Sequence, residues 1–148
     1  IKLPSGEIIE GKAGERIVDV IPGRIGLVAK VGGKVVDLTS RIKEEWKIIE
    51  VLDFNSREGK ETYWHTTAHV MAQAVKRLFP NAKLGIGPPI ENGFYYDFDL
   101  GGYTFTEEDI AKIENEMNKI IKEDIPIFGQ VWARQAPRQA RLSLKISW

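Results

Sequence analysis

The chain contains two histidines, His65 and His69, which lie four residues apart. In an α-helix this spacing places both imidazoles on one face, about one turn apart. Two neutral imidazoles in that arrangement can chelate a metal ion or position a water molecule, and either can accept a proton near neutral pH. The pair also fits a purely structural interpretation, in which one ring is a satisfied polar group at the edge of the core and the other is solvated.

The residues around the pair bear on these alternatives. Apolar neighbours on both sides of His69, in the segment 68–72, predict that its ring points inward. Thr66 stands where the HExxH motif of metalloproteases has its glutamate. With no cysteine and no further histidine, only carboxylates such as Asp97 and Asp99 could complete a metal site. We therefore expect no bound metal at the pair.

A second group of candidate residues lies between residues 85 and 99. Gly85 and Gly87 leave one strand without side chains on one face, so a ligand or another backbone can approach closely. No helix N-terminus follows this Gly-x-Gly closely, which excludes a phosphate-binding loop. An ordinary hairpin with aromatic packing also fits. Period-two alternation places three aromatic rings on one face and three further residues on the other: Phe94, Tyr96 and Phe98 against Tyr95, Asp97 and Asp99.

These candidates lie on a predicted helix and a predicted hairpin. Apolar side chains at three- and four-residue steps predict a helix over residues 61–79, which Pro80 ends. Strands are expected at 83–90 and 94–98, joined by a tight turn at 91–93. The apolar positions of the helix are Ala68, Met71, Ala72, Val75, Leu78 and Phe79.

A second helix is predicted to begin after Thr106, whose hydroxyl suits the N-cap position. Three acidic residues follow, where the positive end of a helix favours them. The buried stripe of this helix is expected to consist of Ile110, Ile113, Met117, Ile120 and Ile121.

Short β-type runs and one short helix candidate, residues 15–20, occupy the first 52 residues. A two-residue hairpin turn is predicted at Gly32-Gly33. This order, two strands, a short helix, two strands and a closing strand, is the layout of a small β-grasp module. The polar segment 53–60 is the predicted domain boundary. The expected strands are 1–3, 7–10, 25–31, 34–38 and 47–52.

Composition excludes several classes of protein. The 148 residues carry 21 basic and 21 acidic side chains, so no global charge favours a nucleic acid or an anionic membrane. Without cysteine, disulfides, thiolate nucleophiles and thiolate metal sites are excluded. No apolar run approaches 18 residues, and the start lacks a signal-peptide core, which indicates a soluble protein.

Taken together, the motifs are similar to a known family. The segment from His65 to His69, followed by PNAKLGIGPPIENGFYYD at residues 80–97, closely resembles the editing domain of threonyl-tRNA synthetases. The module before it resembles the TGS domain of the same enzymes, and the resemblance covers residues 1 to about 127. It implies an α+β protein with a β-grasp (TGS) domain at 1–55 and a partial editing domain at 56–128. In that editing domain a long helix packs on an antiparallel sheet.

The resemblance implies proofreading, the hydrolysis of tRNA(Thr) that carries serine by mistake. In the family, His65 and His69 would orient a water and the terminal ribose without a bound metal, and Tyr96 and Gly87 would contact the substrate. The expected partners are tRNA(Thr) and seryl-tRNA(Thr), in the cytoplasm and without a membrane. ATP with magnesium, zinc and the dimer contacts would belong to the missing parts of the parent synthetase, so no cofactor is expected in this fragment.

The chain departs from the family at two places. The CxxxH half of the family's site is absent, and its lysine and aspartate lie beyond the point where the match stops. Residues 129–148 do not resemble the family's continuation; residues 125–148 contain four basic and no acidic side chains. A cloning or reading-frame accident, vector-encoded residues or a basic RNA-contacting extension would each explain this tail. We therefore expect an N-terminal fragment with half of an editing site and little or no activity.

Two other functions fit parts of the sequence. A non-catalytic TGS-type module would bind RNA or protein in a regulatory role, with incidental histidines. A free-standing, zinc-dependent alanyl-type editing protein would use the same histidine pair, although its further Cys and His ligands are missing.

Overall fold

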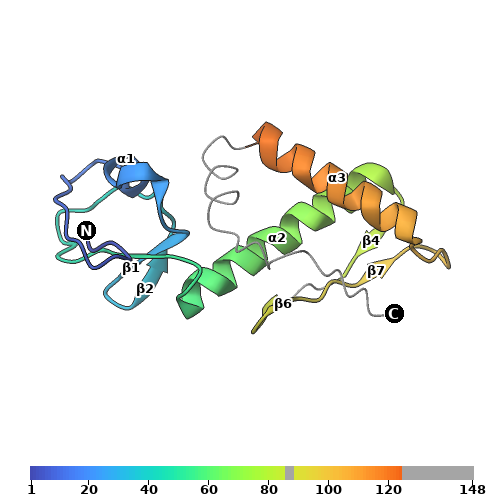
Figure 1. The fold of residues 1–148 in the computed structure, drawn as a ribbon, viewed down its shortest axis with the longest axis horizontal. Helices are drawn as coiled ribbons and strands as arrows, with labels where there is room; N and C mark the ends of the chain where they lie inside the picture. The colour runs from blue at the N-terminus through green and yellow to red at the C-terminus, as the bar shows by residue number, and fades with distance from the viewer. Residues whose placement is uncertain (86–88, 125–148) are drawn as a thin grey trace. The chain divides into compact units, whose positions relative to one another are not determined.

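The computed structural model describes residues 1–85 and 89–124 of the chain (Figure 1). Its described residues form both helices and strands, with two long helices and small antiparallel sheets, in agreement with the predicted α+β class. The chain divides into two compact units, and the boundary between them in sequence falls between Tyr63 and Trp64, inside the long helix α2 (Arg57–Leu78). Within the described residues, no helix has the length and apolarity needed to cross a bilayer.

The first unit contains a three-stranded antiparallel sheet. Its strands are β1 (Val28–Val31), β2 (Lys34–Val36) and β3 (Glu50–Leu52), in the order β2-β1-β3. Val31 pairs with Lys34 around the two glycines, which confirms the predicted hairpin turn. Each strand is shorter than the predicted run, because only the hydrogen-bonded part of each apolar segment belongs to a ladder.

The N-terminal arm extends this sheet beside β3. Lys2 pairs antiparallel with Ile8, so residues 1–9 fold back as the predicted hairpin. Lys2 also pairs in parallel with Glu50. Two backbone hydrogen bonds of 2.8 Å, from Lys2 N to Ile49 O and from Val51 N to Lys2 O, fix this parallel pairing.

Two short helices follow the arm, and the first of them contributes two buried side chains, Ile17 and Val18, to the core of the first unit. They are α1 (Ile17–Val20), within the predicted helix segment, and the 3₁₀ helix η1 (Pro22–Arg24). The buried apolar side chains of this unit come from the arm, the helices, the sheet and the loops between them. They include Leu3, Ile17, Val18, Ile21, Val28, Ala29, Leu38, Ile42, Ile49 and Val51.

Helix α2 begins four residues earlier than the sequence pattern predicted. Ser56 acts as its N-cap, because the Ser56 hydroxyl oxygen accepts a 3.0 Å hydrogen bond from the Gly59 N–H. The same hydroxyl donates to the Asp53 carbonyl at 2.7 Å. A serine before a helix is a recognised start signal, and the apolar periodicity used to place the helix gives no information about it.

The second unit combines α2, a hairpin and a second long helix. Strand β4 (Lys83–Leu84) pairs with β7 (Phe98–Asp99), and β5 (Pro89–Ile90) pairs with β6 (Gly93–Phe94), both antiparallel. The two ladders are nested, so the described residues 83–85 and 89–99 form one irregular hairpin. Ile90 pairs with Gly93 at its tip, which confirms the predicted tight turn.

Helix α3 (Glu107–Asp124) packs with α2 and the hairpin around one hydrophobic cluster. In Figure 1, α2 is drawn between α3 and strands β4, β6 and β7. The predicted stripe of α3 is confirmed, with Ile110 only half-buried. Leu78, one of the apolar positions used to predict α2, is 36% exposed in the last turn of the helix. The buried members of the cluster are Met71, Ala74, Val75, Ala82, Phe105, Ile113, Met117 and Ile120.

A buried carboxylate fixes the start of α3. The Oδ2 atom of Asp109 accepts hydrogen bonds from the Tyr103 hydroxyl (2.6 Å), the Thr106 hydroxyl (2.9 Å) and the Thr106 N–H (3.0 Å). In return, Thr106 Oγ1 accepts from the Asp109 N–H at 3.2 Å, which confirms Thr106 as the N-cap. Chiefly because Tyr103 donates to it, the pKa of Asp109 lies below its usual value.

Replacement of Gly59 by alanine is expected to destabilise the protein. A Cβ at this position would lie 1.8 Å from the Asp53 carbonyl oxygen and 2.7 Å from its carbonyl carbon, both backbone atoms. Helix propensity alone would make Gly59→Ala stabilising by about 1 kcal/mol. The clash is expected to reverse the sign, with a loss of about 1–3 kcal/mol in the free energy of unfolding. Urea denaturation measures it, with exposed Glu61→Ala as the control expected within about 0.5 kcal/mol of wild type. A stabilised Gly59→Ala protein would contradict the packing described.

The Asp109 cap is expected to make stability depend on acid pH. Because the folded pKa is lowered, the ionised carboxylate stabilises the fold above the unfolded value of about 3.9, and this contribution is lost as pH falls through the folded pKa. We expect the free energy of unfolding to fall less steeply below about pH 4 in Asp109→Asn than in wild type. Urea denaturation at several pH values tests this, with Glu107→Gln in the same turn as the control. Parallel acid profiles for wild type and Asp109→Asn would refute the assignment.

Candidate functional site

The two histidines meet on the exposed side of α2. The Nε2 atoms of His65 and His69 are 3.0 Å apart, and their ring centroids are separated by 4.5 Å with the planes at 84°. The prediction that both rings share one helical face is therefore confirmed. Both residues are exposed. The prediction that the His69 ring points inward is wrong, because the neighbouring row of Ala68 and Ala72 faces the core instead.

The short contact between the rings determines what the pair can do chemically. A hydrogen bond between two Nε2 atoms requires one ring to carry the proton there and the other to present its lone pair. In the neutral pair, the donating ring then keeps a lone pair on Nδ1, and the accepting ring keeps an N–H on Nδ1. The pair therefore offers solvent one proton acceptor and one donor. That combination can hold a water molecule and receive its proton.

The aromatic hairpin lies next to the part of α2 that carries the histidines. Trp64, adjacent to His65, packs against Phe94 with ring centroids 6.3 Å apart. Tyr96 stacks on Phe98 at 4.8 Å and 18°, and both rings pack against the hydrophobic cluster. The outer face of the hairpin is exposed, so the predicted alternation is confirmed. Its residues are Tyr95, Asp97 and Asp99.

Of the two glycines that the sequence analysis singled out, Gly85 and Gly87, the structure describes only Gly85. Gly85 donates its N–H to the Asp97 carbonyl at 2.8 Å, and a Cβ there would lie 2.9 Å from the Asp97 Cβ. The predicted close approach is therefore to another backbone. Gly87, the glycine expected to contact the substrate, lies outside the described residues, as does the tail at 129–148.

The two carboxylates that were considered as further metal ligands, Asp97 and Asp99, are both described by the structure. Asp97 and Asp99 are exposed, and the Asp99 Oδ1 atom accepts a 2.9 Å hydrogen bond from the Gly101 N–H. Among residues 1–85 and 89–124, no group of three or more His, Cys, Asp or Glu side chains could hold a metal ion. In this part of the chain, the histidine pair is therefore a two-nitrogen site.

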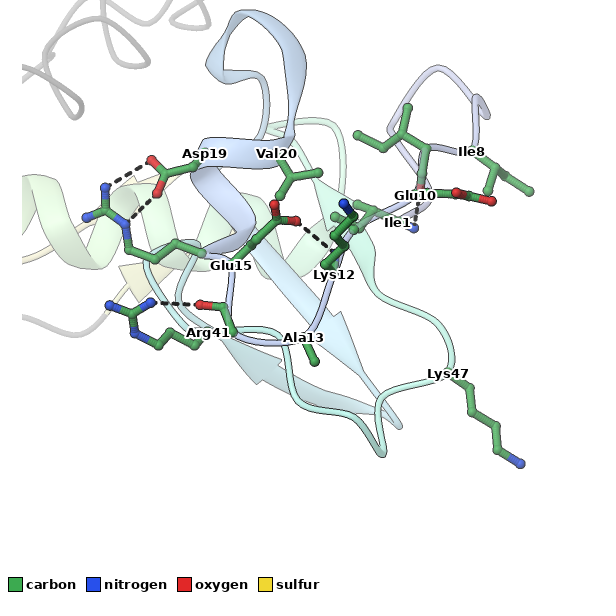
Figure 2. A pocket seen from close by; sticks show the side chains of 14 residues that line it. Ile1, Ile8, Glu10, Lys12, Ala13, Glu15, Asp19, Val20, Arg41 and Lys47 are labelled. Carbon is green, nitrogen blue, oxygen red and sulfur yellow. Dashed lines mark hydrogen bonds and ion pairs between the residues drawn. The ribbon is translucent and has the colours of Figure 1, made fainter.

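The first unit contains a cleft of about 930 Å³ that the sequence did not predict (Figure 2). Its apolar wall comes from the N-terminal arm and includes Ile1, Ile8 and Ile9. Much of the remaining wall is formed by charged residues from the segment 10–19 and from two later loops. These residues are Glu10, Lys12, Glu15, Arg16, Asp19, Arg41 and Lys47. Because the wall combines segments that are distant in sequence, no local sequence pattern predicts the cleft.

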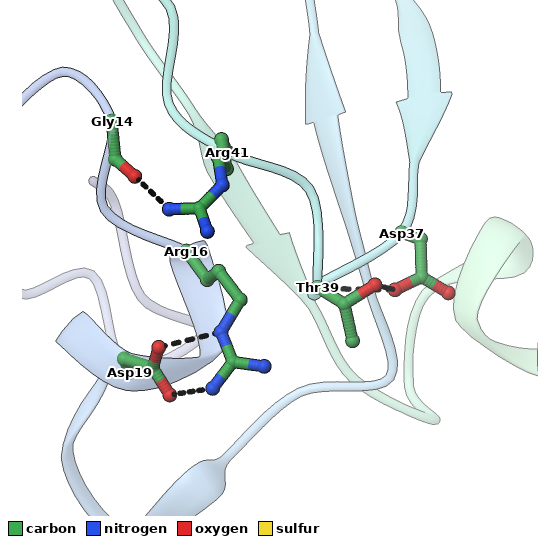
Figure 3. A network of polar contacts seen from close by, with 6 residues as sticks. All are labelled: Gly14, Arg16, Asp19, Asp37, Thr39 and Arg41. Carbon is green, nitrogen blue, oxygen red and sulfur yellow. Dashed lines mark hydrogen bonds and ion pairs between the residues drawn. The ribbon is translucent and has the colours of Figure 1, made fainter.

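The arginines of this cleft hold its loops in place (Figure 3). Arg16 donates two hydrogen bonds to the Asp19 carboxylate, at 2.7 and 2.9 Å, and this contact raises the pKa of Arg16. Arg41 donates to the Gly14 carbonyl at 2.7 Å, which links two loops 27 residues apart in sequence. Both guanidinium groups therefore have a structural role in the cleft wall.

The chain is similar to curated threonine–tRNA ligases of several bacteria. It is 51% identical to that of Desulforamulus reducens over 132 residues, which are 85% of this chain and 20% of the relative. It is 44% identical to that of Symbiobacterium thermophilum over 145 residues, 94% of this chain and 22% of the relative. It is 58% identical to that of Caldanaerobacter subterraneus over 106 residues, 72% and 16% respectively. No family model matches the chain.

These matches bear on the functions considered from the sequence. The relatives are ligases, and they do not favour the alternative of a regulatory TGS-type binding module. They cover most of this chain, whereas the chain spans only about a fifth of their length. The identities of 44–58% confirm the family indicated by the histidine motif and the hairpin motif. The chain therefore belongs to the threonine–tRNA ligase family, as a segment of about a fifth of such a protein.

Proposed function

We propose that the chain is part of an enzyme that joins threonine to tRNA(Thr), and that this segment serves proofreading by hydrolysing seryl-tRNA(Thr). One observation carries the proposal: two exposed imidazoles with Nε2 atoms 3.0 Å apart, in a chain similar to threonine–tRNA ligases. Histidine is the side chain best suited to accept a proton from water at neutral pH.

A ligase for threonine has a physical reason to need a hydrolytic site. Serine lacks one methyl group of threonine, and a missing methyl in a pocket is worth only about 1–3 kcal/mol, or about 10–200-fold in discrimination. Selective binding at one site therefore rejects serine incompletely. A second site that hydrolyses the serine ester adds a further stage of selection.

We assign complementary roles to the two rings. The Nδ1 lone pair of the hydrogen-bond donor ring accepts a proton from the attacking water, and the Nδ1–H of the other ring orients that water or the terminal ribose. Tyr96 contacts the substrate from the hairpin beside α2, with its ring held by Phe98. We retain Gly87, which lies outside the described residues, as a proposed substrate contact.

The proposed site is only half complete in this chain. The family's pattern pairs HxxxH with a CxxxH segment, and this sequence contains no cysteine and no third histidine. The pair alone supplies a base and one donor, and the remaining contacts would come from the other half. We therefore expect this chain by itself to hydrolyse seryl-tRNA(Thr) slowly or not at all.

We infer that the first unit is a TGS domain of the β-grasp type. The support is its strand order, in which the N-terminal strand lies parallel to β3, β1 and β2 follow, and a short helix precedes β1. In the longer ligase, tRNA(Thr) is the partner. ATP with magnesium, zinc and the homodimer contacts belong to parts outside this segment, which itself needs no cofactor for the proposed role.

The catalytic assignment predicts slow deacylation when either histidine is removed. In a full-length ligase that contains this segment, His65→Ala and His69→Ala are each expected to lower the rate of seryl-tRNA(Thr) hydrolysis about 100-fold or more. The rate of threonylation should stay unchanged, because the pair acts in hydrolysis. Release of radiolabelled serine from seryl-tRNA(Thr) measures the first rate, and charging of tRNA(Thr) measures the second.

The control for this experiment is Gln73→Ala. Gln73 is the next exposed residue in the same row of α2, so the variant tests whether any change on this surface slows hydrolysis. Its rate is expected to match wild type. Wild-type hydrolysis in both histidine variants would defeat the assignment.

A further inference from the structure

We propose that Arg16 and Arg41 bind the phosphate group of a small molecule in the cleft of the first unit. This inference goes beyond proofreading and does not depend on it. The residues that line the cleft all belong to the first unit, whereas the histidine pair belongs to the second.

The backbone places the two arginines directly opposite each other. Arg16 pairs antiparallel with Arg41, and a backbone hydrogen bond lies on each side of the pair. These bonds run from the Ile17 N–H to the Ser40 carbonyl at 3.1 Å and from the Ile42 N–H to the Glu15 carbonyl at 2.8 Å. This is the pattern of a non-hydrogen-bonded pair, in which the opposite side chains share one face and lie closest together. Figure 3 shows the two side chains on their neighbouring segments.

Only one of the two guanidinium groups has a carboxylate partner. Arg16 directs its Nε and Nη2 groups at the Asp19 carboxylate, at 2.7 and 2.9 Å. Arg41 donates from Nη1 to the Gly14 carbonyl, and no carboxylate among residues 1–85 and 89–124 pairs with it. Like charges directly opposite each other on neighbouring strands are unfavourable. The pair therefore has an excess positive charge that a bound anion would neutralise.

The remaining donors of the pair suit a phosphate group. Arg16 keeps the N–H groups of Nη1, and Arg41 keeps those of Nε and Nη2. The planar fork of a guanidinium matches phosphate oxygens bidentately. A phosphate monoester has three acceptor oxygens and a charge of about −1.5 to −2, so it can accept from both residues at once. A monocarboxylate has two oxygens and one charge, and it satisfies fewer of these donors.

The acidic residues of the cleft leave the arginine pair open to an anion. Asp19 is already engaged as described, and the Glu15 Oε2 atom accepts a 2.8 Å hydrogen bond from the Lys12 N–H. In Figure 2, Glu10 lies beside the N-terminal arm and apart from Arg41. The acidic side chains are therefore held by other contacts or placed away from the free donors of Arg41.

The size of the cleft indicates that the phosphate belongs to a small molecule. A volume of about 930 Å³ lies within the range of about 300–1,000 Å³ that is typical of small-molecule sites. The isoleucines of the arm offer apolar surface to the rest of an organic phosphate. Inorganic diphosphate and ADP share the phosphate chemistry and differ in this organic part, so a comparison of the two identifies the source of the phosphate.

Calorimetric titration of the purified, untagged chain in phosphate-free buffer tests the proposal. We expect one inorganic diphosphate to bind per chain, and acetate at the same concentrations to give no binding. Tighter binding of ADP than of diphosphate would support an organic phosphate as the source, and equal binding would support a free one. Arg41→Gln is expected to weaken diphosphate binding about tenfold or more, because it removes charged donors.

A second variant should strengthen binding, which a damaged fold would not do. Asp19→Asn removes a negative charge and releases two donor groups of Arg16, so its affinity for diphosphate is expected to rise several-fold. Circular dichroism checks that each variant is folded. This gain keeps the test decisive if the loss of the Arg41 bond to Gly14 disturbs the loop.

Two matched variants outside the cleft remove the same charges. Arg57 and Glu61 are exposed on α2 and pair with each other at 2.9 Å. Arg57→Gln and Glu61→Gln are each expected to bind diphosphate within about twofold of wild type, since exposed charges at a distance are screened by salt. The proposal would be overturned by no diphosphate binding, by equal affinity of wild type and Arg41→Gln, by weaker binding in Asp19→Asn, or by an equal loss in Arg57→Gln. Because the readout is diphosphate binding, the result is independent of deacylation.

Discussion

The periodicity of helix α2 is the constraint on which the histidine site depends. Side chains four residues apart lie in one row of a helix, and neighbouring rows face different directions. Ala68, Ala72 and Val75 occupy the side that packs into the core, and all three are buried. His65 and His69 occupy an adjacent row that remains exposed. The same helix therefore anchors itself in the second unit and holds two imidazoles 3.0 Å apart at its surface.

The position of this helix is held by contacts with the elements around it. Arg77, near the end of α2, donates hydrogen bonds to Glu116 and Glu123 of α3, both at 3.1 Å. Glu116 and then Glu123 raise the pKa of Arg77, which remains a cation throughout the accessible pH range. Exposed ion pairs contribute little energy by themselves. The hydrophobic cluster supplies most of the stabilisation, and the arginine fixes which residues of the two helices are opposite one another.

Sequence reasoning succeeded where one local signal determined the structure. The Thr106 cap and the buried stripe of α3 follow from hydrogen-bonding chemistry and helical periodicity, and both are present. The alternation along residues 94–99 follows from the geometry of an extended chain, although only its ends belong to ladders. The start of α2 was misplaced because Ser56 gives no hydrophobic signal.

Other features could not be predicted because they depend on tertiary structure. Apolar neighbours suggested that the His69 ring points inward, but the direction of a side chain depends on its row in the helix and not on adjacent residues. The cleft in the first unit joins the N-terminal arm to loops that come together only in the folded chain. The histidine spacing was readable from the sequence, whereas the 3.0 Å contact depends on rotamers that the sequence does not specify.

The hydrolysis proposed for this segment sets requirements that two imidazoles meet only in part. Water must be deprotonated, the developing oxyanion must be stabilised, and the leaving ribose oxygen must receive a proton. The pair offers one lone pair and one N–H to solvent, which serve the first step and one of the others. Removal of an oxyanion donor typically costs about 10²–10³ in rate, so a site that lacks such donors remains slow even with a well-placed base. If the pair serves the proposed editing reaction, the CxxxH half of the family's pattern would therefore be expected to supply groups that the two imidazoles lack.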